Sequence, residues 1–147
     1  MGLVYDKLKI FKERFPSTIA WRLKKHANVI EKHLNPGEEV KYVFAAQKGL
    51  SSMDIFSTFA VALTNKRILL AQKRLIFGYT FLAITPDMFN DLTVKSGIIW
   101  GRLFIDTIKE TVLLSNVSKD ALDEIETQIT EYMMNEKKNY LKDKGEH

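Results

Sequence analysis

The chain contains no cysteine, which excludes disulfide scaffolds, thiol nucleophiles and cysteine-ligated zinc. Its longest nearly apolar run, residues 55–63, is far shorter than the roughly 18–20 residues that a membrane-spanning helix needs. The first residues mix acidic and basic side chains and lack the apolar segment and cleavage site of a secretory signal. We therefore expect a soluble, cytoplasmic protein.

Catalytic and cofactor-binding motifs are also missing. The seven glycines form neither a Walker A loop nor Gly-x-Gly-x-x-Gly. His26 and His33 are seven residues apart, whereas metal ligands on one helix are three or four apart, so we interpret both as solvent-facing. Ser51 and Ser52 precede Asp54 without a nucleophile motif, which indicates an ordinary loop and leaves a small hydrolase as the least favoured alternative. We expect no enzyme activity, cofactor or metal.

What is present is an ordinary globular composition with an uneven charge. Of the 147 residues, 46% are hydrophobic, which is enough for one domain with its own core. Residues 1–34 carry eight basic and three acidic side chains, a net charge of +5, whereas the whole chain has +4. The basic character therefore belongs to the N-terminal arm.

Helical periodicity marks this arm. One apolar face recurs at spacings of three and four: Leu3/Val4, Leu8, Phe11 and Phe15. Pro16 ends that segment, and Ser17 is a suitable N-cap for a second helix. The apolar residues of the second helix are Ala20, Leu23, Ala27, Ile30 and Leu34, before the turn residues Asn35-Pro36-Gly37.

The middle of the chain changes to the period of strands. Residues 59–64 alternate large with small side chains, and residues 67–73 continue as a strand after Asn65-Lys66, which we expect at the exposed tip of a hairpin. Further short strands are predicted at 41–47, 79–84, 92–95, 102–105 and 111–114. Consecutive short strands without intervening helices predict an antiparallel sheet that curls or closes.

The helical period returns after Ser118, which can cap a C-terminal helix. Its apolar face comprises Leu122, Ile125, Ile129, Tyr132 and Met133. The residues after Lys137 are polar, and we expect them to fray.

Four stretches resemble the short bacterial pleckstrin-homology (PH) domains of the YokE type, over residues 35–136. They are "HLNPGEEVKYVFAA", "FAVALTNKRILLAQ", "GRLFIDTIKETVLLSNV" and "SKDALDEIETQI". The resemblance implies an α+β fold, a curled antiparallel β-barrel or sandwich capped by a C-terminal helix, with an N-terminal helical extension. The implied organisation is a basic helical arm (1–34), the PH-like domain (35–136) and a polar tail (137–147).

The resemblance also implies a non-catalytic binding or assembly role, and some bacterial relatives are similar in forming ring-like homo-oligomers. Eukaryotic PH domains that bind phosphoinositides carry several bases around the loop between their first two strands. Here that region reads "QKGLSSMD", with Lys48 as its only base, and the closing helix lacks the usual Trp. Inositol-phosphate recognition is therefore not implied.

Our leading hypothesis is a module that self-associates or binds a protein partner. The contact would come from a sheet edge or from Ile98, Ile99, Trp100 and Trp21, because aromatic anchors are typical of interfaces. The alternative for Ile98-Ile99-Trp100 is a place in the core.

A second hypothesis is a peripheral membrane module at the inner face of the membrane. A basic amphipathic helix can lie on an anionic surface, or its apolar seam can dock on its own barrel or on a neighbouring subunit. Nucleic acid is less favoured, because the aromatic residues of the arm lie at helical core spacing. The candidate contacts with an anionic surface are Lys7, Lys9, Lys12, Arg14, Lys24, Lys25, Lys66 and Arg67.

Overall fold

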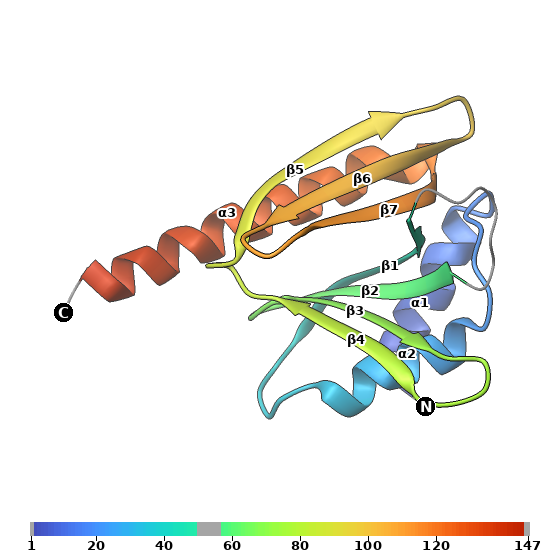
Figure 1. Cartoon of the computed structure of the whole chain (residues 1–147), viewed down its shortest axis with the longest axis horizontal. Helices are drawn as coiled ribbons and strands as arrows, with labels where there is room; N and C mark the ends of the chain where they lie inside the picture. The colour runs from blue at the N-terminus through green and yellow to red at the C-terminus, as the bar shows by residue number, and fades with distance from the viewer. Residues whose placement is uncertain (1, 50–56, 146–147) are drawn as a thin grey trace.

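The computed structural model describes residues 2–49 and 57–145, so Ser51, Ser52 and Asp54 lie outside the described residues. Seven strands form one antiparallel sheet in the order β4-β3-β2-β1-β7-β6-β5 (Figure 1). Their bounds are β1 Val40–Lys48, β2 Thr58–Thr64, β3 Ile68–Lys73, β4 Tyr79–Ile84, β5 Phe89–Ser96, β6 Trp100–Thr107 and β7 Thr111–Ser118. The predicted hairpin is confirmed, since β2 and β3 pair from Leu63 with Ile68 to Ala60 with Ala71.

The sheet is a curled half-barrel whose two halves meet at a short seam. Strands β1 and β7 pair at Gln47 with Ser115 and at Lys48 with Leu114, and the Gly49 N–H donates to the Leu113 carbonyl (2.9 Å), whereas β1 pairs with β2 along nearly its whole length. In Figure 1 strands β5–β7 form the upper layer and β1–β4 the lower layer. Strands β4 and β5 are consequently the two edges of the sheet.

The inner face of the sheet encloses the main core, and a C-terminal helix closes it. A 3-10 turn, Lys119–Ala121, leads into α3, Leu122–Gly145, which runs behind β5–β7 and extends beyond the sheet (Figure 1). The predicted apolar face is confirmed, because Leu122, Ile125, Ile129 and Met133 are buried in this core. The expectation of fraying after Lys137 is wrong, because the helix continues to Gly145.

Two N-terminal helices, α1 Leu3–Arg14 and α2 Leu23–His33, cover the outer face of the sheet. Alternation along β2 explains why they fit: Val61 and Leu63 point into the main core, whereas Ala60 and Ala62 meet the helices. The centre of the arm's apolar seam is buried there, with Val4, Leu8, Ala27 and Ile30 fully covered, whereas Leu3 is exposed and Ala20, Leu23 and Leu34 are half-buried. The arm therefore docks on its own sheet, and the expected α+β architecture with its helical extension is confirmed.

The second helix begins later than its sequence predicts, at Leu23 instead of after Ser17. Tertiary contacts hold residues 15–22 in an irregular path. Ser17 is engaged twice, because its Oγ hydrogen bonds to Ser118 Oγ (2.8 Å) and its carbonyl accepts from Trp100 Nε1 (2.6 Å). Lys12 Nζ donates to the carbonyls of Pro16 (2.9 Å) and Thr18. These bonds occupy the Ser17 hydroxyl and the backbone carbonyls that would otherwise cap and begin a helix after Ser17.

The tip between β2 and β3 separates its two basic side chains. Lys66 is exposed, as expected, but Arg67 turns inward and binds the buried carboxylate of Glu38 (Nε to Oε2, 3.0 Å) and the His33 carbonyl (2.9 Å). Among the described residues, no helix combines the length and the apolar composition that spanning a bilayer requires.

Candidate binding surfaces

The four predicted interface residues divide into two exposed and two half-buried side chains. Ile98 and Ile99, in the β5–β6 turn, are 92% and 51% exposed, so they do not belong to the core. Trp100 is half-buried, and its indole is engaged by the Ser17 carbonyl. Trp21 is also half-buried, with the Arg22 guanidinium 5.4 Å above its ring. Of these four residues, Ile98 and Ile99 expose the most apolar surface.

The predicted basic surface loses part of its charge to internal contacts. Arg14 pairs with Glu124 of α3, Arg67 pairs with Glu38, and Lys12 holds the irregular segment after α1. The others lie on α1, on α2 or at the β2–β3 tip: Lys7, Lys9, Lys24, Lys25 and Lys66. Because most of the apolar side of both helices is buried, a membrane contact through this arm would be mainly electrostatic, with Leu3 and Ile10 as its exposed apolar side chains.

Both helical histidines differ from the expectation of solvent-facing side chains. His26 is only 2% exposed, and its Nδ1 accepts a hydrogen bond from the backbone N–H of Lys73 (2.8 Å). His33 is half-buried and stacks on Phe81 of β4, with ring centroids 4.2 Å apart. The helical pattern did not reveal these roles, because both depend on how α2 lies across β3 and β4.

A second exposed apolar turn, between β3 and β4, was missed by the sequence reasoning. Ile76 and Phe77 are 76% and 83% exposed, and Leu75 beside them is also exposed. Gly78 has the left-handed φ of 71° and closes the turn by accepting a 3.0 Å hydrogen bond from the Arg74 N–H. A signal was present: three apolar residues stand between a predicted strand end and a glycine.

Strand β4 presents an edge without charged side chains. The turn-closing bond pairs Arg74 with Gly78, so the antiparallel alternation directs the backbone groups of Tyr79, Phe81 and Ala83 away from β3. A slot of about 230 Å³ runs beside this edge. It is lined by four consecutive β4 residues, Phe81 to Ile84, and by Met88, Val112 and the β6–β7 turn. Consecutive residues come from both faces of a strand, which places the slot along the edge itself.

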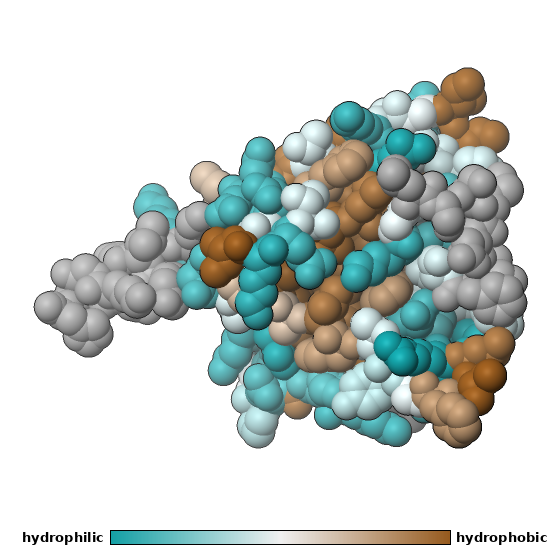
Figure 2. All heavy atoms as spheres, viewed as in Figure 1, coloured by the Kyte–Doolittle hydropathy of each residue, from teal (hydrophilic) through white to brown (hydrophobic). Residues whose placement is uncertain are grey.

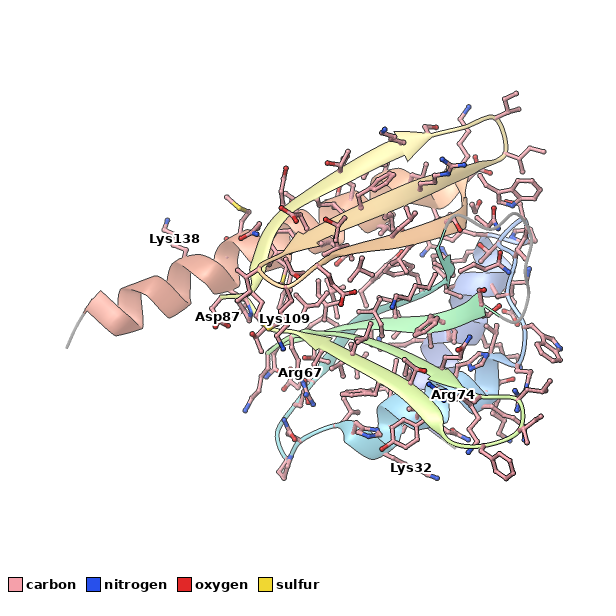
Figure 3. All side chains as sticks on the ribbon, viewed as in Figure 1. Lys32, Arg67, Arg74, Asp87, Lys109 and Lys138 are labelled. Atoms are coloured by element: carbon pink, nitrogen blue, oxygen red, sulfur yellow. The ribbon has the colours of Figure 1, made fainter. Side chains whose placement is uncertain are left out.

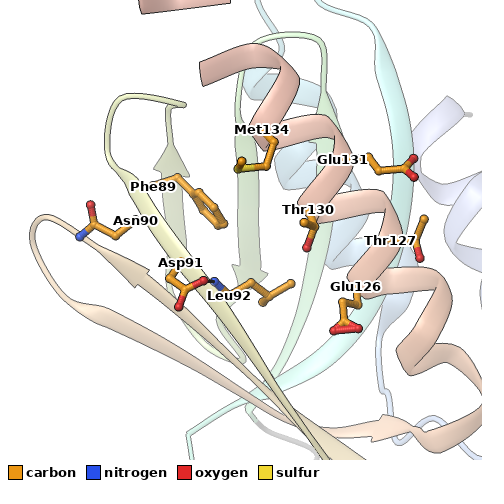
Figure 4. A pocket seen from close by; sticks show the side chains of 9 residues that line it. All are labelled: Phe89, Asn90, Asp91, Leu92, Glu126, Thr127, Thr130, Glu131 and Met134. Atoms are coloured by element: carbon orange, nitrogen blue, oxygen red, sulfur yellow. Dashed lines mark hydrogen bonds between the residues drawn. The ribbon is translucent and has the colours of Figure 1, made fainter. Parts of the chain in front are cut away.

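The other edge borders an acidic groove between β5 and α3. It has a volume of about 480 Å³, and Figure 4 shows Asp91, Glu126 and Glu131 around it, with Phe89 and Met134 at one end. The Asp91 carboxylate accepts a hydrogen bond from the Leu92 N–H (2.8 Å). Within the described ranges, no three histidine or acidic side chains come together to hold a metal ion.

Comparison with known proteins agrees with the fold. A family model described as "Bacterial PH domain" matches residues 34–131. No curated protein matches the sequence. A crystallised pleckstrin homology domain from Shewanella amazonensis is similar in structure, with a TM-score of 0.51 and 15% identity over 77% of this chain and 89% of that chain.

A DUF1696 family protein with a pleckstrin-homology domain, from Shewanella loihica, has a TM-score of 0.49 and 14% identity, over 80% of this chain and 94% of that chain. At such identities the likeness concerns the fold.

Proposed function

Because the chain belongs to the bacterial PH domain family, we propose that it is a non-catalytic assembly module that pairs strand β4 with the β4 of a second copy. The observation that carries the proposal is the edge of β4, which has no charged side chain of its own and no second neighbouring strand among the described residues, beside a slot that Lys109 and Glu110 also line. Unpaired strand edges offer rows of hydrogen-bonding groups and are usually protected by charge, proline or a bulge.

The two edges of the sheet differ in this protection. Strand β4 reads Tyr-Thr-Phe-Leu-Ala-Ile, whereas β5 carries Asp91 and Lys95. The free edge of β4 can pair with another extended, uncharged strand. The β4 of a second copy has these properties, so it can serve as the partner. Antiparallel pairing of the same edge from two copies forms a closed twofold interface, the commonest kind of homodimer.

Proline at position 83 tests the pairing. The Ala83 N–H points away from β3, so Ala83→Pro removes a donor from the free edge without removing a bond of the β3–β4 ladder. The matched control is Ser96→Pro. Gly97 N–H donates to the Trp100 carbonyl, so the neighbouring Ser96 N–H points away from β6 at the other edge.

Light scattering after size exclusion is the measurement. We expect a particle of twice the 17.0 kDa chain mass for the parent protein and for Ser96→Pro, and a monomer for Ala83→Pro. Thermal unfolding of both variants establishes that they remain folded. A parent protein that stays monomeric at high concentration contradicts the proposal. A larger assembly that Ser96→Pro dissociates also contradicts it, because both edges would then be in use.

A further inference from the structure

Two apolar turns project from the same end of the molecule, opposite the end where α3 leaves the sheet. The β3–β4 and β5–β6 turns both lie at the right in Figure 1, and hydrophobic surface occupies the same two corners in Figure 2. The turns carry Leu75, Ile76 and Phe77, and Ile98 and Ile99. Glycines at 78 and 97 make the turns, so chain reversal does not require these apolar side chains.

Basic side chains stand at the base of both turns. Lys73 and Arg74 precede the first turn, and Figure 3 shows Arg74 at the opposite end of β3 from Arg67. At the second turn, Lys95 of β5 lies directly opposite Arg102 of β6. Like charges in such a cross-strand pair repel each other, and the Lys95 ammonium lies 5.3 Å from the centre of the Phe104 ring, which offsets part of this repulsion. An anionic partner would relieve that repulsion.

The neighbouring 3-10 turn adds one charge of each sign. Lys119 N–H donates to the Ile99 carbonyl (2.8 Å), which places Lys119 and the acidic Asp120 beside the second turn. These two charges offset each other, so the described residues beside the apolar turns keep a net positive charge from Lys73, Arg74, Lys95 and Arg102.

A small pocket of about 110 Å³ opens beside the first turn. Cationic and hydrogen-bonding residues dominate its lining: Trp21, Arg22, His26, Gln72, Lys73, Arg74 and Leu75. Arg22 has a left-handed backbone, with a φ of 56°, which is uncommon for a residue with a side chain and is often retained at functional sites. The pocket has the chemistry of a site for one phosphate-sized anion.

His26 forms the buried side of this pocket. Because its Nδ1 accepts the Lys73 N–H, the ring proton lies on Nε2, which is buried. Burial, and then the charge of Arg22, lower the pKa of His26 to about 4, against the smaller opposite effect of the Trp21 backbone. The ring is therefore neutral at pH 7, and attraction of an anion would depend on Arg22, Lys73 and Arg74.

We propose that this end of the molecule docks on an anionic phospholipid bilayer. Leu75–Phe77 and Ile98-Ile99 enter the interfacial region, and the pocket beside Arg74 receives a headgroup phosphate. Two apolar turns, here called the prongs, with basic residues beside each of them suit a bilayer. The bilayer can deform around each prong, and its phosphate groups lie at the depth of the basic side chains. Among the described residues these turns form two apolar corners, whereas a protein interface calls for one contiguous, closely packed patch. This surface does not use the outward lysines of α1 and α2. Its first turn leads directly into β4, so antiparallel β4 pairing would point the apolar turns of the two copies in opposite directions, and one copy of a dimer would meet a given bilayer.

Co-sedimentation of the full chain with vesicles tests the proposal. We expect binding to phosphatidylcholine vesicles that contain phosphatidylglycerol, weakening as salt rises, and no binding to pure phosphatidylcholine. The double variant Ile76→Ser/Phe77→Ser removes apolar anchors, and we expect its partition coefficient to fall more than about tenfold. Arg74→Gln removes one base, and we expect a fall of about fivefold.

The matched control is Ile108→Ser. Ile108 is a 65% exposed isoleucine in the β6–β7 turn, at the end of the sheet away from the two apolar turns, and its loss should leave vesicle binding unchanged. A second control, Lys9→Gln/Lys24→Gln, should weaken binding less than Arg74→Gln, because these lysines lie on the N-terminal helices.

Several results would overturn the proposal. They are no binding to anionic vesicles, equal losses for Ile108→Ser and the double variant, or a greater loss for the helix lysines than for the prongs. Inorganic phosphate separates a lipid headgroup from a free anion. Saturable binding of phosphate that Arg74→Gln abolishes, without any vesicle binding, would identify a free-phosphate site and reject the bilayer.

Discussion

Both carboxylate oxygens of Glu124, at the start of α3, are held by the guanidinium of Arg14, at the end of α1, with distances of 2.7 and 3.1 Å. The Tyr42 hydroxyl of β1 donates to the same carboxylate at 2.6 Å. The hydrogen bond from Arg14 lowers the pKa of Glu124. Burial, and then the hydrogen bond and charge of Glu124, raise the pKa of Tyr42. One carboxylate thus joins the N-terminal arm, the sheet and the closing helix.

The two partners of Glu124 should contribute unequally to stability. Tyr42→Phe removes a half-buried donor to a charged acceptor, and we expect the free energy of unfolding to fall by about 1–2 kcal/mol. Arg14→Gln should cost less, because the Arg14 side chain is exposed and water screens its charge. Denaturant titration of the single and double variants is the measurement. A larger loss for Arg14→Gln than for Tyr42→Phe would contradict this order.

The docking of α1 gives a second prediction. Leu8 is fully buried against the outer face of the sheet, so Leu8→Ala should lower the free energy of unfolding by about 2–4 kcal/mol. Ile10, on the same helix, is 55% exposed, and Ile10→Ala should have almost no effect. Guanidinium unfolding followed by circular dichroism compares them. Equal stability of the two variants would mean that α1 does not pack on the sheet in solution.

Acid stability should depend on Glu38. Burial alone would raise the pKa of Glu38, but hydrogen bonds from Arg67, the Asn35 N–H and Thr64 outweigh it and lower the pKa to about 2. In the unfolded chain the Glu38 carboxyl titrates near pH 4.5. The contribution of Glu38 to the free energy of unfolding is therefore complete above that pH and is lost as the pH falls toward 2. This contribution reaches at most about 3 kcal/mol.

Glu38→Gln should therefore lower stability at pH 7 and flatten the pH dependence between 4.5 and 2. The neighbouring Glu39 is exposed, so Glu39→Gln is the matched control and should leave the acid profile nearly unchanged. Urea midpoints measured across this pH range provide the comparison. Identical profiles for the two variants would reject the role of the Glu38–Arg67 pair.

Protonation of His26 should affect the stability of the protein over a different pH range. The unfolded ring takes up a proton near pH 6.5 and the folded ring near pH 4, so the unfolded chain binds more protons between these values. Stability should fall by about 3 kcal/mol as the pH drops through this window, and this contribution should stay constant below it.

His26→Asn keeps an acceptor near the Lys73 N–H but does not titrate, so it should remove this slope. The ring pKa measured by NMR gives a direct readout. Titration near 6.5 in the folded protein would show that His26 is not buried as described.

The regular elements could be predicted because each depends on its own residues. The residues of β4 follow directly from the sequence, and the large and small faces of β2 anticipate two layers packed on opposite sides of the sheet. The start of α2 could not be predicted, because Ser17 is engaged by Trp100 and Ser118, which lie far along the chain.

The candidate sites depend even more on tertiary placement. The exposed Ile98-Ile99 turn was recognisable as apolar residues beside a glycine, but its alternative place in the core had to remain open. The pocket beside Arg74 joins residues 21–26 to residues 72–75, and no local pattern links these segments. The free edge of β4 follows only from the strand order.

The outer face of the sheet has a practical consequence for anyone shortening this chain. The family match starts at residue 34, yet Val43, Ala45, Ala60, Ala62 and Ala71 are covered by helices that precede it. A fragment trimmed to the matched region would expose these side chains to water over one whole side. Such a fragment should be poorly soluble and prone to aggregate. Any oligomers that it formed would result from the removal of the helices and would not represent the behaviour of the intact chain.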